Sequence, residues 1–320
     1  MSLACPENPD EKGDTLMELA LNSDQIAILD ALDSLAKPYS EVPIGDHSCA
    51  LTSERFDREL ANGGFLDVGF DPDLGAVTAA LIAERLARLP FTTESANSAL
   101  LRPVLGDGVT GPICLVEAGR RAPLVRFLRE GATVVVVGAG EVSCFTATAA
   151  QVRAEPEALY GYPVGTLLSA EGATKIDVPT AEVRTRWRAA LAAEAAGLLA
   201  AALQSVCEHV TQREQFGRPI ASFQAVRHRL AEAQVRTNGL YWLALRAAAS
   251  LDPADAALAA LHAQETAKAC VYDFHQFLGA MGMTLEHPLH LWTYRLKLLT
   301  SELGGRGNQA LAAADALWGC

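Results

Sequence analysis

The sequence lacks any regular pattern of metal-binding or disulfide-forming residues. Its seven cysteines include no Cys-x-x-Cys pair and are odd in number, and its seven histidines are equally scattered. Because no signal peptide precedes them, the cysteines indicate a reducing, cytoplasmic environment. The pair His287-x-x-His290 has no further obvious ligands nearby. We therefore expect no metal site.

Positive charge and long apolar runs are also scarce. The chain has 26 lysines and arginines against 38 aspartates and glutamates, so its formal net charge is -12. Nucleic-acid binding needs a basic surface, which argues against a nucleic-acid partner. No apolar run approaches the roughly 20 residues of a membrane span. With 320 residues, half of them hydrophobic, the chain has the composition of a globular protein with a sizeable core.

The sequence changes character along its length and predicts four parts. Residues 1–22 are polar and predict a flexible leader. Residues 23–103 predict an N-terminal helical domain, in which Ser23-Asp24 could cap the first helix; its helices are expected over 23–36, 52–63, 73–89 and 95–101. Residues 104–179 predict a small β domain, because β-rich runs at 113–116, 133–137, 142–146 and 164–168 alternate with glycine and turn residues.

Residues 180–320 predict a C-terminal helical bundle. A first helix has small and apolar residues along one face between 191 and 210, and a second shows the same spacing between 226 and 248. A third is expected over 254–278 and a fourth over 289–303. Short connections make these helices an antiparallel four-helix bundle. The fold class is thus mostly α with a small central β domain. Because alanine buries little surface, we expect an oligomer.

The most informative segment is Arg213-Glu-Gln-Phe-Gly-Arg-Pro-Ile-Ala-Ser-Phe-Gln224, at the boundary between the first two bundle helices. Arg213 offers planar donors suited to phosphate oxygens, and Phe216 offers a flat face for a ring. Gly217 permits a tight turn, and Gln224 can both donate and accept hydrogen bonds. A plain helix end, with Gly217 as cap and Pro219 preventing continuation, explains the same residues. Taken alone, the helix-end interpretation is the stronger.

A second segment strengthens the other interpretation. It reads Gln276-Phe-Leu-Gly-Ala-Met-Gly282, then Glu286-His-Pro-Leu289 and Tyr294-Arg-Leu-Lys297. Together the two segments resemble the acyl-CoA dehydrogenase family, in which Arg-x-x-Phe-Gly and Phe-Gln are followed by Gln-x-x-Gly-Gly-x-Gly, Glu-x-Pro and Arg-Asp-Ala-Lys. The resemblance covers about residues 23–303. It implies a helical domain, a shortened β-barrel-like domain and a four-helix bundle. It also implies FAD, an acyl-CoA substrate, α,β-dehydrogenation and an electron-transfer acceptor protein.

The resemblance also implies which residues contact the cofactor. They would reach the FAD of a neighbouring subunit, and they are Arg213, Gln215, Phe216, Gln224, Gln276, Gly279 and Ala280, the last in place of a usual glycine. By contrast, Leu115-Val-Glu-Ala-Gly119 is similar only to the start of the family's flavin loop, and the tryptophan-containing strand that covers the flavin is not recognisable. This combination resembles the short subunit of bacterial heteromeric acyl-CoA dehydrogenases of the steroid-CoA type. It implies a homologous partner subunit that holds most of the flavin.

The catalytic base of the family is not clearly present. Glu302 stands one residue before the family's position without the following Gly-Thr, and a solvated glutamate near a helix C-terminus is the better explanation. The alternative position, at the start of the first bundle helix, holds Trp187, so Glu182 could only be a displaced substitute or a first-turn glutamate. Arg188 matches an arginine near the substrate, or is an exposed helix-start residue. Two alternatives therefore stay open, a homomeric enzyme that uses Glu302 or Glu182 and a flavin-free helical scaffold.

Overall fold

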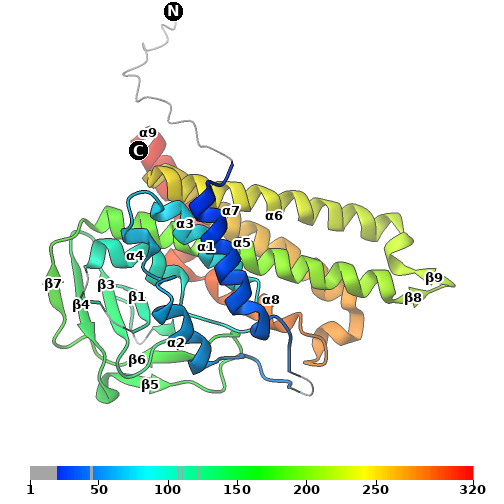
Figure 1. Cartoon of the computed structure of the whole chain (residues 1–320), viewed down its shortest axis with the longest axis horizontal. Helices are drawn as coiled ribbons and strands as arrows, with labels where there is room; N and C mark the ends of the chain where they lie inside the picture. Colours follow the sequence, from blue (N-terminus) through cyan, green and yellow to red (C-terminus); the bar gives the residue numbers. More distant parts are fainter. Residues whose placement is uncertain (1–19, 44–45, 107, 110, 122, 320) are drawn as a thin grey trace, which may run out of the picture.

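The computed structural model of the chain describes residues 20–43, 46–106, 108–109, 111–121 and 123–319. Most of the predicted leader, residues 1–19, lies outside this part. Figure 1 shows long helices along the molecule, with the strands gathered mainly at one end and a small hairpin at the other. About 60% of the chain is helical. The predicted fold class, mostly α with a small β region, is confirmed.

The N-terminal part consists of four helices close to the predicted ranges. They are α1 (Ser23–Ala36), α2 (Glu54–Asn62), α3 (Gly75–Ala87) and α4 (Ala96–Leu105). Helix α1 is capped by Asn22 rather than by Ser23-Asp24, since the Asn22 side chain accepts a hydrogen bond from the Gln25 backbone N–H. Ser53 caps α2 in the same way. Helices α3 and α4 pack against each other and against the long helix of the C-terminal part.

The β region consists of two small sheets. One has the order β1-β3-β4-β7, with β1 and β3 parallel and the other neighbours antiparallel. The other is antiparallel, with the order β2-β6-β5. The strands are β1 (Ile113–Glu117), β2 (Leu124–Arg126), β3 (Thr133–Val137), β4 (Val142–Thr146), β5 (Val152–Ala154), β6 (Val164–Leu167) and β7 (Thr174–Ile176). The sequence did not predict β2, β5 or β7, because three residues are too few to show an alternating pattern.

The C-terminal part contains three long helices and two shorter ones: α5 (Thr180–Gln212), α6 (Gln224–Ser250), α7 (Pro253–Leu278), α8 (His290–Leu299) and α9 (Gly305–Trp318). The hairpin β8 (Glu214–Gln215) and β9 (Arg218–Pro219) joins α5 to α6. The predicted fourth helix, 289–303, is wrong in length, since α8 ends at Leu299. Leu303 and the two glycines after it have positive φ, so the chain turns and starts α9.

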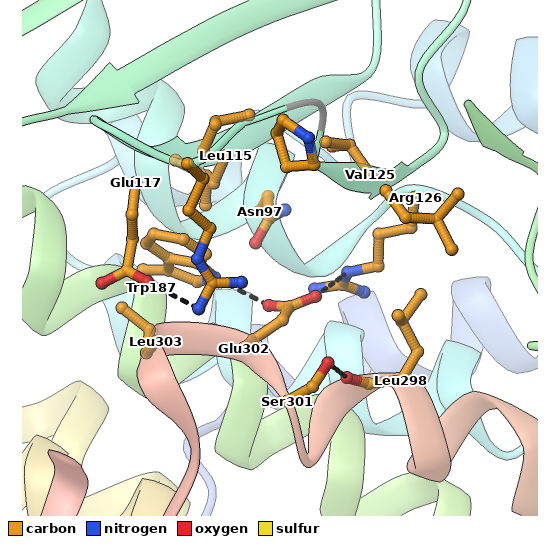
Figure 2. Close-up of a pocket in the computed structure, with 14 residues that line it drawn as sticks. Asn97, Leu115, Glu117, Val125, Arg126, Trp187, Leu298, Ser301, Glu302 and Leu303 are labelled. Carbon is orange, nitrogen blue, oxygen red and sulfur yellow. Dashed lines mark hydrogen bonds and ion pairs between the residues drawn. The ribbon is translucent and has the colours of Figure 1, made fainter. Parts of the chain in front are cut away.

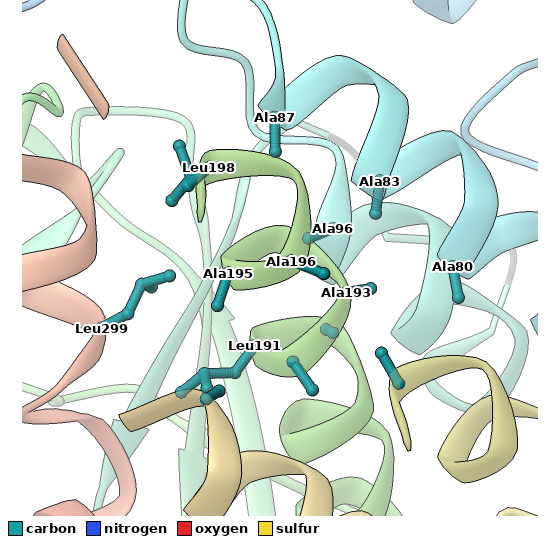
Figure 3. Packing of buried hydrophobic residues seen from close by; sticks show 14 of the residues in the cluster. Ala80, Ala83, Ala87, Ala96, Leu191, Ala193, Ala195, Ala196, Leu198 and Leu299 are labelled. Atoms are coloured by element: carbon teal, nitrogen blue, oxygen red, sulfur yellow. The ribbon is translucent and has the colours of Figure 1, made fainter. Parts of the chain in front are cut away.

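Helix α5 is the centre of the core and contacts α3, α4, α6, α7 and α8. Figure 3 shows alanines of α3 and α5 facing each other. The helices come so close at Gly197 that an added Cβ would lie 2.1 Å from the Glu84 carbonyl oxygen. By length and composition α5 could cross a membrane, but 78% of its most apolar stretch is buried inside the protein. It is therefore the core helix of this fold.

Candidate functional site

The predicted phosphate-binding segment forms the β8–β9 hairpin at one end of the bundle (Figure 1). Gln215 pairs with Arg218, and the two residues between them, Phe216 and Gly217, have φ values of 55° and 76°. Positive φ at both central positions is the geometry of a type I′ turn. Gly217 is thus a hairpin residue and not the cap of α5, which ends at Gln212. A phenylalanine in this conformation is strained, and such strain is often found at functional positions.

The hairpin is held by its own aromatic contacts. The Phe223 ring meets the Phe216 ring edge-on at 6.1 Å between centroids, and the Arg218 guanidinium lies 4.2 Å from the Phe223 centroid. Even so, Phe216 is 90% exposed. Arg213, Gln215 and Gln224, which begins α6, are exposed as well. An aromatic ring and several polar groups are therefore exposed at this end of the bundle, where a partner molecule could contact them.

The second predicted segment lies at the same end of the bundle. Helix α7 ends at Leu278, and Gly279 (φ 59°) starts a short 3-10 turn over Gly279–Met283. Gln276, Gly279 and Ala280 are all exposed. In the loop that follows, the His287 ring contacts the ring of His209 near the end of α5, with 5.4 Å between centroids. This contact brings the second segment towards Arg213.

Histidines fix the shape of this loop. His275 contacts the Gly282 carbonyl oxygen through Nδ1 at 2.6 Å and the Thr293 hydroxyl through Nε2 at 3.0 Å. Burial, with repulsion from His209 and His290, lowers the pKa of His287 to about 4. The His287 ring is therefore neutral at pH 7. Positive charge at this end comes instead from Arg213 and Arg218, for which the described residues offer no ion-pair partner.

The first half of α5 carries a closed cluster of buried charges, and Figure 2 shows three of its members, Arg126, Trp187 and Glu302. Arg126 of β2 forms ion pairs with Glu194 of α5 and, through Nε at 2.7 Å, with Glu302. Trp187 Nε1 donates a hydrogen bond of 2.8 Å to the second oxygen of Glu302. Tyr162 donates a hydrogen bond of 2.7 Å to Glu194. We call these five residues the Arg126 cluster.

The Arg126 cluster leaves little free space. Burial alone would lower the pKa of the Arg126 guanidinium, but Glu194 and Glu302 raise it well above its ordinary value, so the arginine stays charged. The adjoining cavity, lined also by Leu115, Val116 and Glu117 from the predicted flavin loop, has a volume of about 50 Å³. Small-molecule pockets usually measure about 300–1,000 Å³. A flavin ring does not fit here without breaking the cluster.

The structure brings both predicted positions of the base together, at Glu302 and Trp187. Glu302 is not a solvated glutamate, because its two carboxylate oxygens contact Arg126 and Trp187 and its side chain is 15% exposed. Glu182 lies in the first turn of α5 and pairs with Arg186 at 3.4 Å. Arg188 is partly buried, and its Nε donates to Gln309 of α9 at 2.8 Å. The assignment of any of these as a base or substrate residue stays a prediction.

Sequence reasoning missed Arg126, Glu194 and Tyr162. One signal was available, because Glu194 is the only charged residue in the stretch from Ala189 to Leu203, which is otherwise almost entirely alanine and leucine. A charged side chain on the buried face of a core helix requires a partner. Arg126 could not be identified as that partner, since it lies 68 residues away in the chain.

Comparisons with known proteins agree with this fold. The family model for the C-terminal domain of acyl-CoA dehydrogenases matches residues 183–317. Acyl-CoA dehydrogenase FadE34 of Mycobacterium tuberculosis is 36% identical over 149 residues, which is 44% of this chain and 21% of that protein. The matched segments span 33% and 41% of the length of two further acyl-CoA dehydrogenases of the same organism.

Solved structures extend the likeness to nearly the whole chain. The ChsE4-ChsE5 complex of Mycobacterium tuberculosis matches with a TM-score of 0.68 and 19% identity, over 92% of this chain and 97% of that one. The Tcur3481-Tcur3483 steroid acyl-CoA dehydrogenase matches with a TM-score of 0.70 and 19% identity, over the same shares. At 19% identity the solved structures support the fold alone, and the family assignment depends on the sequence matches. The C-terminal part of the chain, residues 183–317, matches the acyl-CoA dehydrogenase family, and the chain as a whole has the fold of that family.

Proposed function

We propose that this chain is a subunit of an FAD-dependent acyl-CoA dehydrogenase and that it completes the FAD site of a homologous catalytic subunit. The observation that carries the proposal is the outward-facing β8–β9 hairpin, with Phe216 90% exposed in a strained turn. An exposed, fixed aromatic ring beside unpaired arginines is suited to a partner that buries them.

The position of the hairpin supports a cofactor held by another chain. From Trp187, which lines the small cavity, to Arg213 there are 26 residues of α5 and its end, which at 1.5 Å per residue separate Trp187 from the hairpin by about 40 Å. A dinucleotide in contact with Arg213 therefore does not reach the chain's own closed cavity. Any FAD that the hairpin contacts is held mainly by a neighbour.

In this arrangement the residues of the two segments have distinct tasks. Arg213 would donate hydrogen bonds to the phosphates, and Phe216 would pack against a ring of the cofactor. The amides of Gln215, Gln224 and Gln276 would supply further hydrogen bonds. Gly279 and Ala280 would allow the backbone to approach closely. When bound, FAD supplies hydride acceptance for α,β-desaturation of an acyl-CoA, and the electrons then pass to an acceptor protein.

The partner and the substrate are proposed from the relatives. One matching structure is a complex of two differently named subunits, and another is described as a steroid acyl-CoA dehydrogenase. We accordingly propose a heterotetramer that acts on a steroid-CoA. The net charge of -12 and the unpaired state of the cysteines in the described part are compatible with a cytoplasmic location. The domain boundaries at 23–103, 104–179 and 180–320 also stay predictions.

The proposal is tested by visible absorption spectra of the purified chain, alone and after co-expression with its partner. A colourless chain that becomes part of a yellow complex supports it. A chain that alone holds FAD and oxidises an acyl-CoA would instead support the homomeric alternative, with Glu302 or Glu182 as the base to mutate. Absence of flavin from both preparations would support the scaffold alternative.

A further inference from the structure

A second cavity, much larger than the one beside Arg126, lies between the N-terminal helices and the β region. Its volume is about 860 Å³, and it shares no lining residue with the small cavity. Its walls come from the segment 48–66, the start of α4, and the loops that follow β2 and β5. Cavities of this size hold small organic molecules.

The walls of this cavity are largely apolar. Leu60, Leu66, Leu128 and Tyr162 line it and are themselves buried, so they form fixed surfaces. Leu159 lies at the cavity with 60% of its surface exposed. A large exposed leucine beside an open apolar cavity is suited to an apolar ligand.

The charged residues of the cavity are mainly acidic. Two arginines line it, and Arg102 is already paired with Asp67 at 3.0 Å. Five carboxylates line it, and of these only Glu155 is in an ion pair with a described residue, Arg153 at 2.8 Å; the five are Glu54, Asp57, Glu94, Glu155 and Glu157. Such an excess repels anions, including the phosphates of CoA. The cavity therefore differs in chemistry from an acyl-CoA site.

Asp57 differs from the other lining carboxylates in being half-buried without a partner among the described residues: Glu54 and Glu157 are exposed, Glu94 accepts hydrogen bonds from Ser98 and Ile113, and Glu155 is paired with Arg153. Asp57 is half-buried on α2, and no described residue forms a hydrogen bond or ion pair with its side chain. Burial raises its pKa, opposed only by the more distant charge of Arg129. A half-buried carboxylate of this kind is stabilised by a cation that comes within contact distance.

We propose that this cavity binds a compact apolar molecule that carries a positive charge, such as an organic amine. The ammonium group would pair with Asp57, and the apolar body would lie against Leu60 and Phe127. This site does not depend on the proposed FAD role, because it uses none of the residues of the hairpin or of the Arg126 cluster except Tyr162.

The test uses three probes of the same shape: 1-adamantylammonium, 1-adamantanol and adamantane-1-carboxylate. Their binding to the full-length chain is measured by isothermal titration calorimetry. We expect the ammonium to bind at least about tenfold more tightly than the carboxylate, with the alcohol between them. Equal binding of all three, tighter binding of the carboxylate, or no saturable binding of the ammonium would overturn the proposal.

Three variants locate the binding. Asp57→Asn should lower the affinity for the ammonium about tenfold and leave the affinity for the alcohol unchanged. Asp315→Asn removes the same charge from an exposed position on α9 and should change neither affinity. Ala61 is exposed and lines the cavity. Ala61→Trp should lower the affinity for both the ammonium and the alcohol, because the larger side chain fills part of the cavity. An ammonium affinity that is insensitive to Asp57→Asn, or that falls equally with Asp315→Asn, contradicts the assignment.

Discussion

The two ends of helix α5 differ in what their side chains contact. In its first half, Trp187 and Glu194 contact Arg126, Tyr162 and Glu302, and these groups form hydrogen bonds and ion pairs with one another inside the protein. Beyond its end, Arg213 and Phe216 contact little of their own chain and face outward. The family resemblance is kept at the outward-facing end and lost at the closed end. Under the proposed function, the outward-facing end would be the half of a site that serves a neighbour, while the chain's own half has become part of the core.

The largest expected effect is a loss of stability when the cation of the Arg126 cluster is removed. Arg126→Met leaves Glu194 and Glu302 buried without their cation, so we expect the free energy of unfolding to fall by about 3–5 kcal/mol. Urea denaturation measures it. Arg129→Met, three residues along the chain at an exposed position, is the matched control and should change stability by less than about 0.5 kcal/mol. A loss of under 1 kcal/mol for Arg126→Met, on the order of an ordinary surface pair, would show that the cluster does not close this end.

The outward-facing end should respond in cofactor binding and not in stability. Arg213→Ala removes a charged donor that the described residues leave unpaired, so the isolated chain should unfold at the same urea concentration. In the complex with the partner subunit, FAD affinity should fall about 10–100-fold, since a hydrogen bond between charged groups is lost. Arg58→Ala, an exposed arginine on α2, is the control. Unchanged FAD content in the Arg213→Ala complex would favour the scaffold alternative.

Phe216 allows the ring and the turn to be separated. Phe216→Gly removes the ring and also the strain of a side chain at positive φ, so stability should change by no more than about 1 kcal/mol. FAD affinity of the complex should fall about 5–10-fold through the lost aromatic contact. Phe216→Tyr keeps an aromatic ring, so the complex with this variant should bind FAD as tightly as the unmodified complex. If the glycine variant binds FAD normally, the exposed ring has another purpose.

The smallest expected effect concerns pH. The pKa of His287 in the folded chain is about 4, below the ordinary value of 6.5. The unfolded chain therefore takes up the proton first, and stability falls as the pH drops through the range between these values. Because the ring is partly exposed, we expect a loss of only about 1 kcal/mol between pH 7 and pH 5. In His287→Asn, the free energy of unfolding measured with urea should vary less with pH between 7 and 5. An unchanged variation with pH would contradict the role of burial.

The long helices were predictable because their small and apolar residues repeat at helical spacing over many turns. Helix α9 was not predicted, since the expected fourth helix was extended to 303 and the left-handed turn at Leu303 depends on tertiary packing. The two exposed segments were found from local motifs, and Gly217 was correctly expected to form a tight turn. The Arg126 cluster could not be found in this way, because its members come from β2, α5, the loop before β6 and the 3-10 turn at Glu302, which meet only in the folded chain.

The central claim is that this chain contacts FAD without holding one of its own. The most direct measurement is the ratio of FAD to chains in the purified complex with the partner, from the visible absorption of released flavin and the quantified amount of each subunit. We predict one FAD for each pair of one such chain and one partner, and none on this chain alone. Two FAD for each such pair, with flavin retained when this chain is purified by itself, would contradict the account.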